Sequence, residues 1–283
     1  MTICSVVIPC YNQPNYLAES LESVHQQSLT NWEVIIVDDG STEPGIQSVV
    51  DTINDTRVRL VRHPKNRGLA AARNTGFREA RGEYVLPLDS DDVLMPDALK
   101  KLAIGLQNSK ADIIFPDFRS FGTCEGTIHF EVKNAKDLLI YQWIPGSGTL
   151  MRKKIWDVVG GYCEDEILRS GNEDWDFYLS LAEVGFTAIH FSEPLYCYRQ
   201  TPQSMSKHLQ FVDYLTREFM YQRHKALFDQ YHAGPAFLSE GYIRSARAWW
   251  QTRKYVKVIS LLLRAARFKY AWKRMIKRVS HYV

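Results

Sequence analysis

The chain has 283 residues, of which 45% are hydrophobic and 24% are charged, and its formal net charge is +3. These values are ordinary for a globular protein and exclude a disordered, collagen-like or membrane-spanning chain. The five cysteines include no CxxC pair, which argues against a disulfide framework or a zinc site and for a reducing compartment.

Short apolar runs alternate with amphipathic stretches in the first part of the chain. We predict strands at 5–9, 34–37, 57–61 and 84–88 and helices at 15–27, 44–53, 69–81 and 95–107, the last with Pro96 in its first turn. The run 34–37 is apolar throughout, which is typical of a strand buried on both faces. This alternation indicates βαβ units and a parallel sheet, in which ligands bind beyond the carboxyl ends of the strands.

The remainder of the chain differs from the first part in its predicted elements and in its charge. We predict strands at 113–115, 187–191 and 195–199, helices at 152–158 and 173–184, and almost continuous helix from residue 207, interrupted at 233–235. Residues 1–206 carry 19 Lys and Arg against 28 Asp and Glu, whereas residues 207–283 carry 16 against 4. The acidic and basic parts are therefore expected to have different functions.

The chain shows no targeting or membrane-spanning segment. Its N-terminus begins a strand-like run without a preceding basic segment, so we expect no secretory signal. The apolar run 258–263 is too short to cross a bilayer. We expect a cytoplasmic protein that at most lies peripherally on the inner face of the membrane.

The first of three acidic clusters, Asp38-Asp39-Gly40-Ser41, directly follows the apolar run 34–37. A carboxylate at this strand end can accept hydrogen bonds from a nucleobase or a ribose hydroxyl, and Gly40 permits a tight turn. An Asp-Gly turn without any ligand explains the same residues. This cluster by itself leaves both interpretations open.

The second cluster, Asp89-Ser90-Asp91-Asp92, follows the predicted strand 84–88. Three carboxylates within four residues repel one another unless a cation neutralises them. Hard oxygen ligands at this density suit Mg²⁺ or Mn²⁺, which also bind phosphate oxygens. A calcium-binding EF-hand is excluded, because Leu94 and Lys100 stand where that loop needs Gly and Glu. The remaining alternative is a cluster that only caps the following helix.

The third cluster, Gly171-Asn172-Glu173-Asp174-Trp175-Asp176, opens the predicted helix 173–184. Acids at a helix N-terminus explain it without any function, but beside the other clusters it supplies a carboxylate base that is not a metal ligand. Arg73 lies on the first turns of the predicted helix 69–81, where it can reach a diphosphate with help from the helix N-terminus. A solvated helix arginine is the alternative.

Taken in order, five segments resemble the family-two inverting glycosyltransferases. The segments are VVIPCYN, VIIVDDGS, NRGLAAARNTG, YVLPLDSDD and GNEDWDFYL, the last preceded by Gly160-Gly161-Tyr162, and the resemblance covers residues 3–206. It implies an α/β chain of GT-A fold, with a Rossmann-like, mostly parallel sheet flanked by helices and here a C-terminal helical extension. The domains would be a catalytic domain at 1–206, with a nucleotide-binding half at 1–110 and an acceptor-binding half at 111–206, and a basic helical extension at 207–283.

The resemblance also implies an activity and its residues. The activity is metal-dependent transfer of a hexose-type sugar from a nucleotide-diphosphate donor, UDP by default, to an acceptor hydroxyl in a cell-surface polysaccharide or glycan. Asp89 and Asp91 match the DxD motif, Asp91 binding Mn²⁺ or Mg²⁺ and Asp89 the ribose or the metal shell. Asp174, in the pair Glu173-Asp174, would be the catalytic base. The nucleotide-binding residues would be Pro9, Tyr11, Asp39, Asn66, Arg73 and Asp89, and we predict acceptor contacts from Trp175 and Arg199.

One departure from the family pattern concerns the metal. Many relatives carry Tyr-Arg-x-His after the strand that follows the base, and this histidine can assist the metal. Here the sequence is Tyr198-Arg199-Gln200-Thr201. His208 is the candidate substitute, and a more weakly held metal is the alternative.

The C-terminal tail, residues 251–283, contains ten Lys or Arg and no Asp or Glu. Apolar residues are interleaved with them: Tyr255, Val258, Leu261, Leu262, Phe268, Tyr270, Trp272, Met275 and Ile276. A basic helix with aromatic anchors can lie on an anionic membrane surface, where a lipid-linked acceptor would be found. A helical pair packed on the catalytic domain explains the same pattern. Nucleic acid binding is not predicted, because no recognition motif accompanies the charge.

Two other functions fit parts of the sequence. A nucleotidyltransferase also needs acids, a metal and a nucleotide-binding sheet, but would carry a glycine-rich loop with Lys or Arg where this chain has Cys10-Tyr11-Asn12-Gln13. A catalytically silent binding subunit attached to membranes by its tail would be favoured by loss of an acid from the three clusters. None of these acids is lost.

Overall fold

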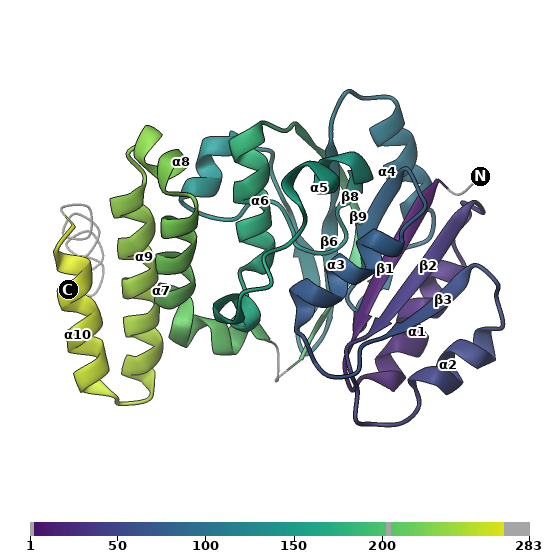
Figure 1. Cartoon of the computed structure of the whole chain (residues 1–283), viewed down its shortest axis with the longest axis horizontal. Coiled ribbons are helices and arrows are strands. Elements are labelled where there is room, and N and C mark those ends of the chain that lie inside the picture. The colour runs from purple at the N-terminus through teal and green to yellow at the C-terminus, as the bar shows by residue number, and fades with distance from the viewer. Residues whose placement is uncertain (1–2, 202–204, 269–283) are drawn as a thin grey trace. The chain divides into compact units, whose positions relative to one another are not determined.

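The computed structural model describes residues 3–201 and 205–268 (Figure 1). These residues form two compact units: unit 1 comprises 3–133, 143–164 and 184–201, and unit 2 comprises 134–142, 165–183 and 205–268. Two segments from the middle of the chain, 134–142 and 165–183, therefore belong to the same compact unit as the C-terminal helices. The functional boundary between residues 206 and 207 stays a prediction.

Unit 1 is built around a mostly parallel sheet. The described strands follow the order β3-β2-β1-β4-β8-β6-β9-β5, with β7 paired to β6. Their bounds are β1 Cys4–Cys10, β2 Trp32–Asp38, β3 Val58–Arg62, β4 Tyr84–Pro87, β5 Val93–Leu94, β6 Ile113–Gly122, β7 Gly126–Ile128, β8 Leu150–Arg152 and β9 Ala188–Gln200. Among strands β1 to β4, every strand pair is parallel, as predicted. Strand β8 is antiparallel to both of its neighbours, β4 and β6. The sequence does not predict β5, β7 or β8.

The helices of unit 1 are α1 Pro14–His25, α2 Ile46–Ile53, α3 Leu69–Glu79, α4 Ala98–Gln107 and α5 Lys153–Val159. The predicted start of α4 is wrong: Asp97, with a φ of 61°, separates Pro96 from the helix. The two strands predicted at 187–191 and 195–199 form the single strand β9. Pro194, which cannot donate a ladder hydrogen bond, lies where the register with β6 shifts.

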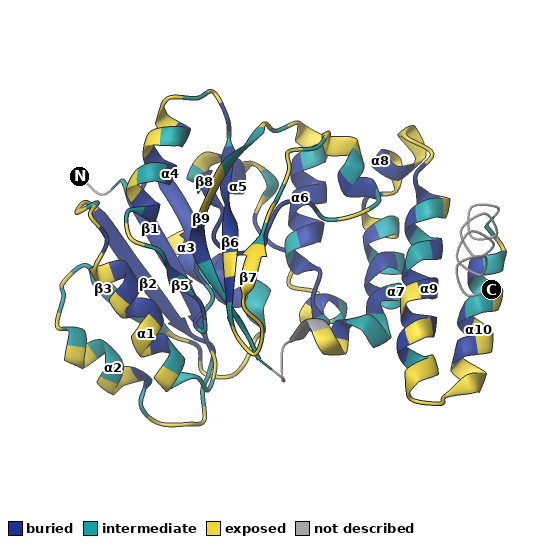
Figure 2. Cartoon of the chain, turned by 180° about the vertical axis from the view of Figure 1, so that it is seen from behind, coloured by how far each residue is buried: buried dark blue, intermediate teal, exposed yellow. Residues whose placement is uncertain are grey.

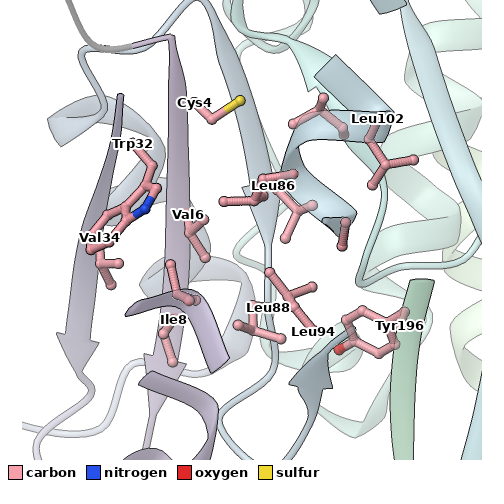
Figure 3. Packing of buried hydrophobic residues seen from close by; sticks show 14 of the residues in the cluster. Cys4, Val6, Ile8, Trp32, Val34, Leu86, Leu88, Leu94, Leu102 and Tyr196 are labelled. Carbon is pink, nitrogen blue, oxygen red and sulfur yellow. The ribbon is translucent and has the colours of Figure 1, made fainter. Parts of the chain in front are cut away.

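Helices pack on both faces of the parallel strands. One cluster joins Val6, Ile8, Val34, Leu86 and Leu88 of the sheet to Leu102 of α4 (Figure 3). Ile36 of the sheet, Leu17 and Leu21 of α1 and Leu99 of α4 belong to the same cluster. Val7 and Ile35 are equally buried but do not belong to this cluster. Their strands, β1 and β2, also contact α3. Because successive strand residues face opposite sides, coverage of both sides explains the uninterrupted apolar run 34–37.

Unit 2 is helical. Its elements are the 3-10 helices η1 Ala135–Leu139 and η2 Glu166–Ser170 and the helices α6 Glu173–Val184, α7 Met205–Arg223, α8 Lys225–Gln230, α9 Gly234–Gln251 and α10 Tyr255–Ala266. Helix α9 contacts both α7 and α10. Its residues Tyr242, Ile243 and Ala246 form a small apolar core with Val258, Leu261 and Ala265 of α10. No described helix combines the length and the hydropathy needed to cross a membrane.

His224, between α7 and α8, is buried against two carboxylates of α6. Its Nε2 lies 2.9 Å from Oδ1 of Asp176, and its Nδ1 lies 2.9 Å from Oε1 of Glu183. Burial lowers the pKa of His224, but the two carboxylates outweigh burial and the net effect raises this pKa above its usual 6.5. The protonated ring therefore stabilises unit 2.

We expect His224 to make the stability of the protein depend on pH. Because its folded pKa is raised, its contribution is complete below about pH 6.5 and is lost as the pH rises through the folded pKa. His224→Gln should therefore lower the free energy of unfolding most at about pH 6, and the deficit should shrink towards about pH 9. Urea unfolding at both pH values measures this. A deficit that does not change with pH would show that His224 acts through packing alone.

Candidate functional site

The segment 89–92 leaves the carboxyl end of β4 in unit 1 and is held by buried hydrogen bonds. Oδ2 of Asp92 accepts from Oη of Tyr196 at 2.6 Å, and Oδ1 accepts from the backbone N–H of Arg199 at 2.7 Å. Oγ of Ser147 lies 2.5 Å from Oη of Tyr196 and accepts from the backbone N–H of Asp89 at 3.1 Å. Asp92 is thus a structural residue that fixes the other two acids in place.

The three carboxyl groups of this segment have different electrostatic environments. Burial, reinforced by the charges of Asp89 and Asp91, raises the pKa of Asp92 well above its usual range. Burial, followed by the charge of Asp89, raises the pKa of Asp91 to about 6. Asp89 itself pairs with Arg73. A bound cation would relieve this crowding of negative charge.

A metal ion fits this segment only if a ligand completes its coordination. In the described ranges 3–201 and 205–268, no three or more His, Cys, Asp or Glu side chains are grouped to hold a metal ion. Mg²⁺ and Mn²⁺ in nucleotide-handling sites, however, are commonly held by one or two carboxylates together with substrate phosphates. Asp91 and Asp89 would be such a pair, and their role as metal ligands stays a prediction. His208 lies exposed on α7 in unit 2, and its role as a substitute ligand stays a prediction.

Arg73 is a buried arginine of unit 1. Helix α3 places it so that Nη2 donates to Oδ1 of Asp89 at 2.9 Å, and its guanidinium lies 5.6 Å from the centre of the Tyr162 ring. Its exposed fraction is 2%, so the alternative of a solvated helix arginine is wrong. A buried arginine that is already oriented loses little entropy when it binds phosphate oxygens.

The segment 38–41 forms the turn that the sequence allows. Oδ1 of Asp38 accepts from the backbone N–H of Ser41 at 2.9 Å. The carboxylate of Asp39 is buried and accepts from the backbone N–H groups of Arg67 at 2.9 Å and Gly68 at 2.8 Å, and Nδ1 of His63 lies 2.6 Å from its Oδ1. Asp39 therefore fixes the loop 63–68 to the end of β2. Nucleotide binding by Asp39 stays a prediction.

The other predicted nucleotide-binding residues differ in exposure. Pro9 is buried in β1, whereas Tyr11 and Asn66 are exposed in the loops that follow β1 and β3. An exposed tyrosine ring in such a loop is available to stack on a nucleobase. The structure places these residues in unit 1 with Asp39, Arg73 and Asp89, and their contacts with a nucleotide stay predictions.

Gly40 lies against the backbone of the loop 63–68. Its φ is 73°, and a Cβ there would stand 2.6 Å from the backbone nitrogen of Asn66. Gly160 has a similar φ of 77°, but a Cβ there would meet nothing within 4 Å. Both glycines therefore have a positive φ that disfavours other residues, but only at Gly40 would a Cβ also clash with neighbouring atoms.

We expect Gly40→Ala to destabilise the protein more than Gly160→Ala. Both variants should lose about 1–2 kcal/mol, because an alanine strains the left-handed region. Gly40→Ala should lose about 1–3 kcal/mol more, because its neighbour is backbone and cannot rotate away. Urea unfolding of both variants measures the difference. Equal losses would show that the loop 63–68 moves aside at little cost.

The third cluster begins α6 in unit 2, and its acids are not equally accessible. Glu173 and Asp176 are buried, whereas Asp174 is half-buried. Oδ2 of Asp174 accepts from Nε2 of Gln142 at 2.7 Å, and Oδ1 accepts from the backbone N–H of Trp175 at 2.7 Å. Asp174 is thus an oriented carboxylate that solvent can reach, which is what a general base requires.

A buried polar network fixes the start of α6 within unit 2. Asn172 has a φ of 70°, and its Nδ2 donates to Oγ1 of Thr216 at 2.8 Å and to Oδ1 of Asp213 at 3.2 Å. Oδ2 of Asp213 accepts in turn from Nε of Arg217 at 2.9 Å. Helix α7 therefore supplies side chains that hold the turn preceding Asp174. The sequence does not predict this network or Gln142.

The structure gives both predicted acceptor-binding residues internal partners. Trp175 is buried in unit 2, and its Nε1 donates to the backbone oxygen of Leu138 at 2.7 Å. Arg199, in unit 1, donates from Nε to the backbone oxygen of Asp91 at 2.7 Å, and its guanidinium lies 4.4 Å from the centre of the Phe121 ring. Acceptor contacts by Trp175 and Arg199 stay predictions.

Comparison with known proteins matches more than half of the chain, including the first two acidic clusters, to one family. The profile described as glycosyl transferase family 2 matches residues 5–167. An uncharacterized glycosyltransferase of Haemophilus influenzae is 34% identical over 210 residues, covering 71% of this chain and 69% of that protein. The putative teichuronic acid biosynthesis glycosyltransferase TuaG of Bacillus subtilis is 32% identical over 211 residues, covering 72% and 81%. The match to glycosyltransferase GlyG of Streptococcus pneumoniae, 34% identical, covers 46% of this chain and only 44% of that protein.

Solved structures confirm the predicted GT-A fold. S. aureus TarS 1–349 in complex with UDP has a TM-score of 0.62 at 22% identity, covering 86% of this chain and 71% of that one. The mannosyltransferase PcManGT from Pyrobaculum calidifontis, in complex with GDP-Man and Mn²⁺, has a TM-score of 0.57 at 19% identity, covering 95% and 87%. At these identities the likeness concerns the fold.

Proposed function

Because the chain belongs to glycosyl transferase family 2, we propose that it transfers a sugar from a nucleotide-diphosphate donor to an acceptor hydroxyl and inverts the anomeric carbon. UDP is the favoured nucleotide, and the transferred group is a hexose-type sugar. The acceptor is a cell-surface polysaccharide or glycan, free or lipid-linked. The observation that carries the proposal is the pair Asp89 and Asp91, held at the end of β4 by Asp92 and adjoining the buried Arg73.

In the proposed reaction, residues of unit 1 bind the donor. Asp39, Tyr11 and Asn66 would contact the nucleoside, and Arg73 the diphosphate, since a guanidinium donates two parallel hydrogen bonds to phosphate oxygens. Mn²⁺ or Mg²⁺, when bound through Asp91 and Asp89, would stabilise the negative charge that develops on the departing diphosphate. The ion pair between Asp89 and Arg73 would open as the donor binds, so that both groups then act on the donor.

Asp174 of unit 2 would act on the acceptor. It takes the proton of the attacking hydroxyl as the new bond to the anomeric carbon forms and the bond to the diphosphate breaks. A single displacement needs no nucleophile from the enzyme and inverts the anomeric centre. Gln142 holds Oδ2 of Asp174, so the carboxylate is oriented before the acceptor arrives.

The proposed setting is cytoplasmic, at the inner face of the membrane. A nucleotide-sugar donor and a glycan or lipid-linked acceptor are the proposed substrates, with an anionic membrane surface as a further partner. The relative named for teichuronic acid biosynthesis supports a role in polysaccharide assembly. The neighbours in complex with UDP and GDP-Man support a nucleotide-sugar donor.

A donor panel tests the proposal. The purified chain is incubated with UDP-, dTDP- and GDP-sugars and Mn²⁺ or Mg²⁺, and release of free nucleotide is followed. We expect metal-dependent release from one donor, slow without an acceptor. If no donor turns over and calorimetry with UDP and Mn²⁺ detects no binding, the transferase proposal fails and a catalytically silent binding subunit becomes the better account.

A further inference from the structure

Helix α10 has a second apolar face that no described element covers. Val258, Leu261 and Ala265 pack against α9. Val256, Ile259 and Leu263 lie on the opposite side of the helix, because residues spaced by three and four share a face. Their exposed fractions are 85%, 59% and 65%. Such a stripe of exposed aliphatic side chains indicates a binding surface.

Aromatic residues extend this stripe at the turn between α9 and α10, where exposed residues gather (yellow in Figure 2). Trp250 lies in the last turn of α9 and Tyr255 begins α10, and both are exposed. Their ring centres lie 5.2 Å apart at an interplanar angle of 71°. We call Trp250, Tyr255, Val256, Ile259 and Leu263 together the α10 surface. Tryptophan and tyrosine beside aliphatic residues are typical of the boundary between water and acyl chains.

Positive charge flanks the α10 surface. Residues 251–268 contain five Lys or Arg and no Asp or Glu. Arg264 pairs with Glu218 at 3.1 Å. Arg253, Lys254 and Lys257 are exposed, and none of them pairs with a carboxylate among the described residues. These positive charges, which no described carboxylate neutralises, favour an anionic binding partner.

The charge pattern also decides against a second copy of the chain. A two-fold interface would bring the same basic residues of both copies together, and like charges there repel. A nucleic acid would satisfy the charge but not the aliphatic stripe. An anionic lipid surface satisfies both, with headgroups for the basic residues and the acyl boundary for the apolar ones.

We propose that the α10 surface binds the full chain to anionic lipid membranes. Of the tail residues expected from the sequence, only Tyr255 belongs to the α10 surface. Val258 and Leu261 belong to the core of unit 2, and Tyr270, Trp272, Met275 and Ile276 lie outside the described residues. This proposal names the residues through which the chain would bind the membrane surface proposed above. The purpose of that binding, access to a lipid-linked acceptor, rests on the proposed function. The binding itself requires neither donor nor turnover.

Co-sedimentation of the full-length chain with vesicles tests this. Wild type should bind phosphatidylcholine vesicles that contain phosphatidylglycerol, bind pure phosphatidylcholine far less, and lose binding as salt rises. A variant that combines Val256→Glu, Ile259→Glu and Leu263→Glu should bind at least about tenfold more weakly. The matched control combines Ile104→Glu, Val158→Glu and Val184→Glu, which change exposed apolar residues of α4, α5 and α6 and should leave binding unchanged.

Three results would overturn the proposal: no binding by wild type, equal binding by the α10 variant, or an equal loss in the matched control. Gel filtration adds a fourth, because a wild-type dimer that dissociates in the α10 variant would make this surface a subunit interface. Circular dichroism confirms that each variant is folded. Nucleotide release measured in solution on the same samples separates the two proposals, since vesicle binding without release would contradict only the proposed function.

Discussion

Replacing Asp174 with asparagine should slow sugar transfer by about 10²–10⁴-fold, because the acceptor hydroxyl then loses the group that takes its proton. Asparagine has nearly the same shape, and it can still accept from the backbone N–H of Trp175 through its oxygen. The fold of unit 2 should therefore be retained. Donor affinity should also be unchanged, because the proposed role of Asp174 is to take the proton of the acceptor hydroxyl and not to bind the nucleotide.

The measurement pairs a steady-state transfer assay with calorimetry of UDP binding. Asp229→Asn is the control, since Asp229 is another acid of unit 2, exposed on α8, and should leave both quantities unchanged. Retention of transfer within a few-fold of wild type would remove Asp174 as the base. A parallel loss of UDP affinity would instead make it a donor-binding residue. Glu173 is the less suitable base, because its side chain is buried.

Asp91→Asn should abolish the effect of Mn²⁺ and slow transfer by about 10³-fold, which corresponds to losing several kcal/mol of charge stabilisation on the departing diphosphate. The substitution removes a negative charge from a segment in which burial and Asp89 raise the pKa of Asp91. Thermal stability should therefore be retained or increased. This outcome distinguishes a binding residue from a structural one.

Calorimetry with and without Mn²⁺ measures the metal effect directly. Wild type should bind UDP more tightly when Mn²⁺ is present, and Asp91→Asn should bind it with the same affinity in both conditions. Asp51→Asn, an exposed acid on α2, should behave as wild type. If Asp91→Asn still responds to Mn²⁺, the ion is held elsewhere, and His208→Ala becomes the next variant to test.

Local patterns in the sequence predict most of the elements that carry these residues. The apolar run 34–37 lies inside β2, and α6 starts and ends as predicted, at Glu173 and Val184. Such patterns depend on neighbours within a few residues along the chain, which fix periodicity and burial. For this reason the amino-acid sequence alone is enough to place Asp38 at the end of a strand, and Asp39 and the acids at 89–92 beyond strand ends.

The sequence by itself thus determined the family, the acidic clusters and the order of most strands and helices, but not β5, β7 or β8. Only the tertiary structure decided what each side chain does. Tyr196 reaches Asp92 across 104 residues of sequence and makes it structural, and Gln142 orients Asp174 from 32 residues away. Val258 and Val256 are chemically alike, yet one is buried and the other exposed. Periodicity shows that a helix has an apolar face, but which face another helix covers depends on packing between segments distant in the chain.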